Sequence, residues 1–345
     1  MTVKILEKKD LNRFVEGLMK ETNVFGVTKK KGTTRFDFAK LESPDDLCLD
    51  YDVTLVSPKK YFTPQEETLL NFTRGDKPTV ASVVEAQETV IIGIHPYDLK
   101  AIGQMDKVFS DGNRDENYLK KREASILIGV DMTRASEKAF CASMDSAVVE
   151  EGFDLMLTDI GGGYTVTVGT DKGAQLLKKY AAVRDATDKE IAARDKAREK
   201  AKRLFGDRKL NMPCTDLPEL LKGKERHPVW HLKAEKCLSC GSCNLVCPTC
   251  YCFDVKDETD LHLKEGRRYR VWDGCLLEDF AAVGSGENFR EERAARYRHR
   301  FYRKGQYLYQ KYGDIACVGC GRCAKACLPD IADPVEVYNT LKEEL

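Results

Sequence analysis

The sequence predicts two domains of different fold class, an α+β domain in the N-terminal half and a helical domain built on clustered cysteines in the C-terminal half. Helix-like and strand-like stretches alternate over residues 1–182, where no cysteines cluster. A helix-favouring segment and a proline-containing stretch follow over 183–230 and form a linker. Two cysteine runs of equal spacing then lie within 231–345, and a chain of 345 residues is long enough to bury two cores.

In the N-terminal domain, hydrophobic periodicity predicts a helix and three strands. Residues 10–20 (DLNRFVEGLMK) have the pattern of an amphipathic helix with the aspartate as its N-cap. The β-branched run 90–94 predicts a buried strand. Strands are also expected at 154–160 and 164–168, on either side of three glycines that form a tight turn. These glycines do not indicate a nucleotide-binding loop, because they lack the G-x-G-x-x-G order and no helix begins directly behind them.

The linker begins with residues 183–205, which are rich in Ala, Lys, Arg and Glu and contain no Gly or Pro. This composition predicts one long solvated helix. Residues 211–231 contain three prolines and are expected to connect this helix to the second domain.

Both cysteine runs have the spacing C-x-x-C-x-x-C-x-x-x-C. This spacing is typical of ferredoxins with two 4Fe–4S clusters, in which three thiolates of one run bind one cluster and the fourth binds the other. The first predicted cluster takes Cys237, Cys240, Cys243 and Cys327, and the second takes Cys317, Cys320, Cys323 and Cys247. Both runs contain a glycine, Gly241 and Gly321, where we expect the backbone to pass close to the inorganic core. The sequence therefore predicts a protein that conducts electrons.

Other uses of cysteine fit this chain less well. Zinc sites usually use C-x-x-C pairs rather than runs of four. A disulfide framework is typical of small secreted domains, whereas this chain begins MTVKILEKKD without an apolar signal segment. No apolar run approaches the length of a membrane span. We expect a soluble protein of a reducing, anaerobic cytoplasm.

The overall charge gives no indication of a nucleic-acid or membrane partner. Lys plus Arg and Asp plus Glu both number 56, so no global field attracts an anionic polymer or surface. The five histidines are scattered, and no catalytic constellation is evident from their order.

Nearly seventy residues separate the two runs, far more than in a minimal ferredoxin, and most are compatible with helix. We therefore expect a helical two-cluster ferredoxin domain rather than one built on β-hairpins. The insertion contains an arginine-rich segment whose positive charge would neutralise a cluster or bind an acidic partner, with a solvated helix face as the alternative. The candidate cofactor-binding residues are Arg296, Arg298, Arg300 and Lys304.

Nearly the whole chain resembles one family, the iron–sulfur β subunits of cytoplasmic nickel–iron hydrogenases (sulfhydrogenases) and the A subunit of anaerobic sulfite reductase. The resemblance depends on CLSCGSCNLVCPTCYC at 237–252, CVGCGRC at 317–323, VWDGC at 271–275, HPYDLKAI at 95–102 and FCAS at 140–143. It implies a partner subunit that holds FAD and NAD(P), and a catalytic redox subunit.

This chain departs from the family pattern at several positions, including the proline after the second run, which is displaced by one to Pro329. Tyr97 and Asp131 stand where the family commonly has cysteine, and Asp145 stands for a glycine. Four cysteines beyond the ferredoxin pair are candidates for a third 4Fe–4S cluster that joins the domains, with core packing as the alternative. They are Cys141, Cys250, Cys252 and Cys275.

Three functions remain open from the sequence. The favoured one is an electron-transfer subunit of a flavin-linked oxidoreductase, such as a hydrogenase, a sulfite reductase or a bifurcating complex. The second is a self-contained iron–sulfur enzyme with a substrate or flavin site in the N-terminal domain. The third is a non-catalytic redox-sensing cluster protein.

Overall fold

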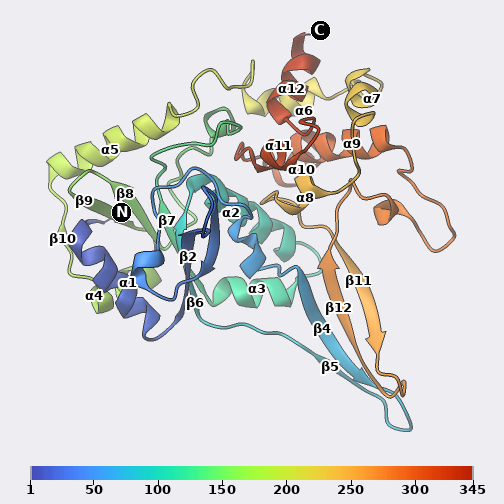
Figure 1. Ribbon diagram of the computed structural model, residues 1–345, viewed down its shortest axis with the longest axis horizontal. Helices are drawn as coiled ribbons and strands as arrows, with labels where there is room; N and C mark the ends of the chain where they lie inside the picture. The colour runs from blue at the N-terminus through green and yellow to red at the C-terminus, as the bar shows by residue number, and fades with distance from the viewer. Residues whose placement is uncertain (1, 344–345) are drawn as a thin grey trace.

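An eight-stranded sheet forms the N-terminal part of the computed structural model, which describes residues 2–343 (Figure 1). The strand order is β10-β1-β9-β8-β7-β6-β2-β3. The central strands β2, β6, β7 and β8 run parallel, and the remaining pairings are antiparallel. The strands are β1 (Val3–Glu7), β2 (Asn23–Lys29), β3 (Phe36–Lys40), β6 (Thr89–Ile94), β7 (Ser125–Val130), β8 (Leu155–Asp159), β9 (Gly163–Val168) and β10 (Arg184–Asp185).

Helices cover this sheet because its central strands are apolar on both faces. Strand β6 (TVIIGI) is buried at every position after the first, as expected for a parallel strand with two covered faces. Helix α1 contributes Phe14, Val15 and Leu18 to the core, and all three are fully buried. The helices of this part are α1 (Leu11–Met19), α2 (Pro96–Ser110), α3 (Glu116–Glu123), α4 (Asp171–Tyr180) and α5 (Asp188–Lys202).

The parallel centre corrects the predicted α+β class. Strands β6 and β7 are parallel neighbours, and α2 and α3 lie between them in the chain. Parallel strands joined through helices define an α/β arrangement. The N-terminal part is therefore a mixed α/β sheet with antiparallel strands toward its edges.

The local elements predicted for this part are largely confirmed. Helix α1 begins at Leu11, after a 3-10 turn over Lys8–Asp10, although the Asp10 side chain makes no capping hydrogen bond. Strand β6 lies where it was expected, and β8 and β9 form an antiparallel hairpin around the glycines. Gly161, with φ of +95°, has the left-handed backbone that this turn requires.

The predicted long helix is wrong at both ends, since α5 spans only Asp188–Lys202. Thr187 caps it, because its side chain accepts from the Glu190 amide while the Glu190 carboxylate accepts from the Thr187 amide. This capping box fixes the start of the helix. The residues before it, Arg184–Asp185, instead pair with β1.

A second sheet, which we call the arm, projects from the body at the lower right of Figure 1. Its order is β11-β12-β4-β5, so both halves of the chain contribute strands. The inner strands β4 and β12 pair antiparallel. Buried Arg270 of β12 donates to Glu67 of β4 at 2.7 Å. The strands are β4 (Glu66–Thr73), β5 (Thr79–Ser82), β11 (Phe253–Thr259) and β12 (Glu265–Trp272).

The arm does not confirm the expectation that the insertion between the cysteine runs is helical, because strands β11 and β12 lie there as well as helices α9 (Arg293–Tyr302) and α10 (Leu308–Tyr312). Its hairpin β11–β12 is completed by β4, which lies almost two hundred residues earlier in the chain. A pairing over this sequence separation leaves little trace in local pattern. The predicted boundary between two domains stays a prediction, but the two halves share this sheet.

Helices form the rest of the cysteine-bearing half around an aromatic core. Trp230, Tyr297, Phe301, Tyr302 and Tyr338 are almost fully buried there. The helices are α6 (Leu217–Leu220), α7 (Val229–Ala234), α8 (Ser242–Leu245), α9 (Arg293–Tyr302), a π-helical segment (Arg303–Tyr307), α10 (Leu308–Tyr312), α11 (Arg322–Ala326) and α12 (Pro334–Glu343). Short 3-10 turns lie at Pro44–Asp46, Pro58–Tyr61, Cys141–Met144, Cys214–Asp216 and Asp279–Ala281.

Candidate metal centre

The second cysteine run lies at the carboxyl edge of the parallel strands. Strand β6 ends at Ile94, and Asp98 follows it in the first turn of α2. The Asp98 carboxylate accepts two hydrogen bonds from Arg322 of the run, at 2.7 and 2.6 Å, and both side chains are buried. Arg322 also donates to the Thr54 carbonyl at 2.9 Å. The run therefore occupies the edge at which open α/β sheets hold their ligands.

The backbone of residues 138–141 packs directly on this run. The Phe140 amide donates to the Gly319 carbonyl at 2.7 Å, and the Ser146 hydroxyl donates to the Val318 carbonyl at 2.6 Å. Gly319 and Gly321 have φ of +66° and +76°. A Cβ atom on Gly321 would lie 2.4 Å from the Lys138 carbonyl carbon.

This packing adds a second reason for the glycines. We expected them to make room for the inorganic core. The atoms that a side chain on Gly321 would meet belong to the backbone of Lys138 and Ala139, in the N-terminal half. Gly241 of the first run has a φ of +68° and lies against Leu277. Both glycines are needed for left-handed backbone, and Gly321 also for contact between the two halves.

The four cysteines predicted for the second cluster line one small cavity of about 20 Å³. Helix α8 ends just before the last cysteine of the first run and packs against α11, which contains Cys323 of the second run. Burial raises the pKa of the Cys317 thiol, and the neighbouring Cys323 and Cys247 raise it further. Burial likewise raises the pKa of Cys320 to about 12. Four thiolates in such a cavity require compensating positive charge, which the iron of a cluster supplies. The lining cysteines are Cys247, Cys317, Cys320 and Cys323.

The cysteines predicted for the first cluster are nearer to solvent. Cys237, Cys243 and Cys327 belong to one apolar cluster, whereas Cys240 is exposed. Burial raises the pKa of Cys243 to about 12, with Arg300 acting against this shift and Cys327 adding to it. A hydrogen bond with Ser242 lowers the pKa of Cys240. The two predicted sites thus differ in exposure.

Within residues 2–343, no three side chains of His, Cys, Asp or Glu converge closely enough to hold a single metal ion. A 4Fe–4S cluster places its four thiolates around a larger body, each on its own iron. The four cysteines around this cavity are the donor set that this second kind of ligand uses. All fourteen cysteines are free thiols.

Buried basic side chains also fit an anionic group at this site. Arg300 and Lys304, both less than a tenth exposed, line the cavity with the cysteines. Burial lowers the pKa of Lys304, but Cys247 and Cys250 outweigh this effect and raise it. Arg296 and Arg300 each have a buried Nε with no acceptor among the described protein atoms. Sulfur atoms of a bound cluster are suitable acceptors for such donors.

The four predicted basic residues do not all lie beside cysteines. Arg296 donates to the Ser239 hydroxyl at 3.2 Å, inside the first run. Arg300 donates to the Cys243 carbonyl at 3.3 Å. Arg298 instead donates to the Glu225 carbonyl at 2.8 Å, on a half-exposed face.

Two of the extra cysteines contact Asn244, and a third, Cys252, lies near one of them. The Asn244 side-chain amide lies 3.6 Å from the Cys250 sulfur and 3.4 Å from the Cys275 sulfur. Burial raises the pKa of Cys252 to about 11, and the neighbouring Cys275 adds to this shift. Cys141 lies elsewhere, because its thiol donates to the Gly319 carbonyl at 3.3 Å. Cys141 therefore hydrogen bonds to the second cysteine run, whereas Cys250 and Cys275 lie at Asn244.

Sequence reasoning missed several residues of this site. Asp98 and Arg322 lie inside the quoted motifs, but their pairing has no local signal. Buried Lys59 donates to the Cys250 carbonyl at 2.9 Å and lies 4.4 Å from the centre of the Trp272 ring. Asn244 was visible only as a polar residue within a cysteine run.

The positions that depart from the family pattern are filled by paired side chains. The Tyr97 hydroxyl lies 2.8 Å from His95 Nδ1, and Tyr51 stacks on the His95 ring at 3.9 Å. Buried Asp131 accepts from the Thr158 hydroxyl at 2.6 Å. At Tyr97 and Asp131, where the family commonly has cysteine, this chain therefore has side chains that are hydrogen bonded to their neighbours.

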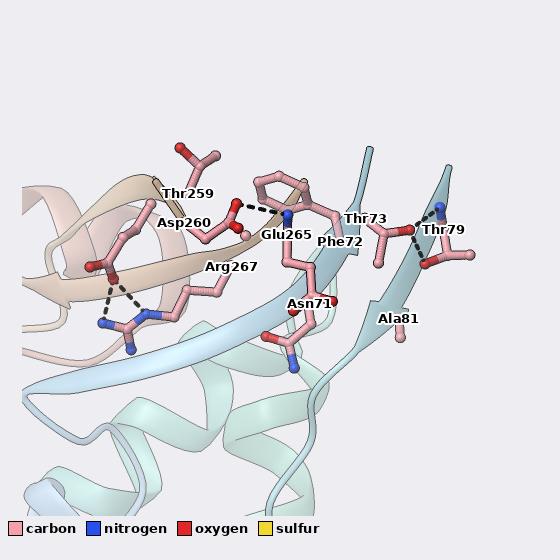
Figure 2. Close-up of a pocket in the computed structure, with 11 residues that line it drawn as sticks. Asn71, Phe72, Thr73, Thr79, Ala81, Thr259, Asp260, Glu265 and Arg267 are labelled. Atoms are coloured by element: carbon pink, nitrogen blue, oxygen red, sulfur yellow. Dashed lines mark hydrogen bonds and ion pairs between the residues drawn. The ribbon is translucent and has the colours of Figure 1, made fainter. Parts of the chain in front are cut away.

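An open groove on the arm contains structural interactions (Figure 2). Arg267 pairs with Glu66 at 3.0 Å and with Glu258 at 2.8 Å. Asp260 accepts from the amides of Lys264 and Glu265, which closes the β11–β12 turn. These pairings hold strands together and give no support to a substrate or flavin site.

Comparison with known proteins agrees with this geometry. A family model described as a 4Fe-4S dicluster domain matches residues 236–331. Sulfhydrogenase 2 subunit beta of Pyrococcus furiosus is 31% identical over 333 residues, which cover 96% of each chain. None of the helices in residues 2–343 combines the length and the apolar character that a membrane span needs.

Proposed function

Because the chain belongs to the family of iron–sulfur beta subunits that includes this sulfhydrogenase subunit, we propose that it is the electron-transfer subunit of a multisubunit oxidoreductase. The observation that carries the proposal is the cavity lined by Cys247, Cys317, Cys320 and Cys323. A 4Fe–4S cluster bound there supplies one-electron transfer. The chain itself supplies the ligands, the burial and the nearby positive charge.

The two cysteine sets differ in exposure, and this difference supports an electron relay between a buried site and a site near the surface. The second set is buried between the halves of the chain, against Asp98 and residues 138–141. The first set includes exposed Cys240. A relay needs one end accessible to a partner, and the surface around Cys240 provides this access.

The basic residues of α9 and of the π-helical segment after it stabilise negative charge. Arg300 and Lys304 keep positive charge against the cavity, and Arg296 does the same beside the first run. Positive charge near a cluster favours its reduced form and raises its potential. Arg298 is assigned no part in this, since it hydrogen bonds to Glu225.

A third cluster is proposed at the extra cysteines. Its centre would be Cys250 and Cys275, which contact Asn244, together with Cys252, which lies near Cys275. The sequence assigned Cys141 as the fourth ligand, and this assignment requires Cys141 to leave its hydrogen bond with Gly319.

The partners follow from the family resemblance. We propose a flavoprotein subunit that holds FAD and NAD(P), a catalytic redox subunit, and a cytoplasmic location. The test is anaerobic native purification of the tagged chain, followed by cofactor and subunit analysis. The expected result is a stable complex with a flavoprotein, in which the clusters are reduced by NAD(P)H only when that subunit is present. Recovery of the chain alone, or turnover by the isolated chain, would contradict the proposal.

A further inference from the structure

The turn between β2 and β3 presents a patch of unpaired positive charge, which we call the basic turn. Its four cationic side chains are exposed, and none forms an ion pair within residues 2–343. The acidic residues nearby are already paired, because Asp37 pairs with Lys60, Asp50 with Arg134, and Asp52 with Lys325. The basic turn consists of Lys29, Lys30, Lys31 and Arg35.

Hydrogen bonds hold this turn in a defined shape. The Lys30 amide donates to the Arg35 carbonyl at 2.9 Å, and the Thr33 amide donates to the Lys30 carbonyl at 3.1 Å. The Arg35 amide donates to the Thr33 hydroxyl at 3.1 Å. Gly32 has the left-handed φ of +72° that the chain reversal requires. The four charges are therefore displayed on an ordered turn.

The basic turn is connected to the second cysteine run by a short chain of contacts. Phe36, the residue after the turn, forms a bridge with Thr54. The Thr54 carbonyl accepts from Arg322, whose neighbour in the chain is Cys323. Strand β2 is also parallel to β6, so it ends at the same edge of the sheet as Asp98. The patch thus lies on the side of the molecule where the second cluster site is seated.

We propose that the basic turn is a docking site for a small acidic electron-carrier protein that exchanges electrons with the second cluster site. The inference rests on the proposed relay function. An acidic protein surface complements four unpaired cations, and such complementarity raises association rates by about ten- to a thousand-fold at low salt. A polyanion is disfavoured because the formal net charge of the chain is zero and the patch is confined to one turn.

The test compares two charge-reversal variants of the full-length chain, loaded with clusters and purified with its partner subunits. The first is K29E/K30E/K31E. The matched control is K189E/K196E/K200E, which makes the same charge change at exposed lysines of α5. A reduced bacterial ferredoxin of negative net charge is mixed with each protein by stopped flow, and cluster reduction is followed at low and high NaCl.

The expected result is a rate at least about ten-fold lower for K29E/K30E/K31E at low salt, with a flattened salt dependence, and a control rate within about two-fold of the wild type. Reduction by dithionite should be the same in all three proteins, which shows that the clusters are intact. Equal rates for the two variants would overturn the docking site. Loss of binding to anionic vesicles in the first variant, with an unchanged ferredoxin rate, would also overturn it in favour of a lipid surface. A wild type that dithionite cannot reduce would instead overturn the relay function.

Discussion

Arg322 and Asp98 form a buried, two-bonded ion pair between the second cysteine run and the N-terminal half, at 2.7 and 2.6 Å. The Asp98 side chain is fully buried, and that of Arg322 is 2% exposed. Burial raises the pKa of Asp98, while Arg322 acts against this shift. Arg322 also lies 5.4 Å from the centre of the Tyr97 ring. This ion pair therefore anchors the second cysteine run to the N-terminal half of the chain.

Replacement of Asp98 by Ala should lower the free energy of unfolding by about 3–5 kcal/mol, because Arg322 is left buried without its partner. The double variant D98A/R322M removes both charges and should lose less than the single variant. Anaerobic guanidinium unfolding measures both. An equal loss in the two variants would show that the charge pair is not the cause.

The contacts of the second cysteine run illustrate what the sequence could and could not predict. Cysteine spacing is local, so it identified the set that contains Cys247 and the second run, and these four line one cavity. The partner of Arg322 is 224 residues away and had no local signal. The same holds for Lys59, which reaches the Cys250 carbonyl from 191 residues away.

The sequence did not predict the arm, for a related reason. Its strand β11 is exposed at all seven positions, so it lacks the alternation of apolar and polar burial that identifies a strand. What stabilises it is pairing through β12 to β4, together with the buried contact of Arg270 with Glu67. The start of helix α5, by contrast, could have been predicted from Thr187 and Glu190, which form its capping box. The prediction from composition did not use these two residues.

Gly321→Ala should destabilise the contact between the halves. The substitution adds the cost of a left-handed backbone and a Cβ atom 2.4 Å from the Lys138 carbonyl carbon. Gly313→Ala is the matched control, because its φ of +75° is nearly the same and no atom lies within 4 Å of its Cβ position. We expect the loss in unfolding free energy to be about 1–3 kcal/mol larger for Gly321→Ala, from overpacking. Equal losses in a denaturant titration would show that backbone conformation alone requires glycine here.

Iron and sulfide analysis under strict anaerobiosis should give about eight iron atoms per chain if two sites are filled, and about twelve with a third. Cys240→Ala should lower iron by about four atoms and destabilise the module, since ligation is coupled to folding. The double replacement of Cys48 and Cys214 by Ala is the control and should leave iron unchanged. Stoichiometric zinc in place of iron would refute the cluster assignment.

The third cluster is tested by separate replacement of Cys275 and Cys141. Cys275 lies with Cys250 at Asn244, so Cys275→Ala should lower iron by about four atoms per chain and leave the spectra of the other two clusters unchanged. Packing alone predicts unchanged iron and a loss of only about 1–2 kcal/mol in stability. Cys141→Ala then decides the fourth ligand. The same loss of iron would show that Cys141 joins the two halves through metal. Full iron in this variant would leave Cys141 as a buried thiol on Gly319, and the group around Asn244 would need a ligand from another residue.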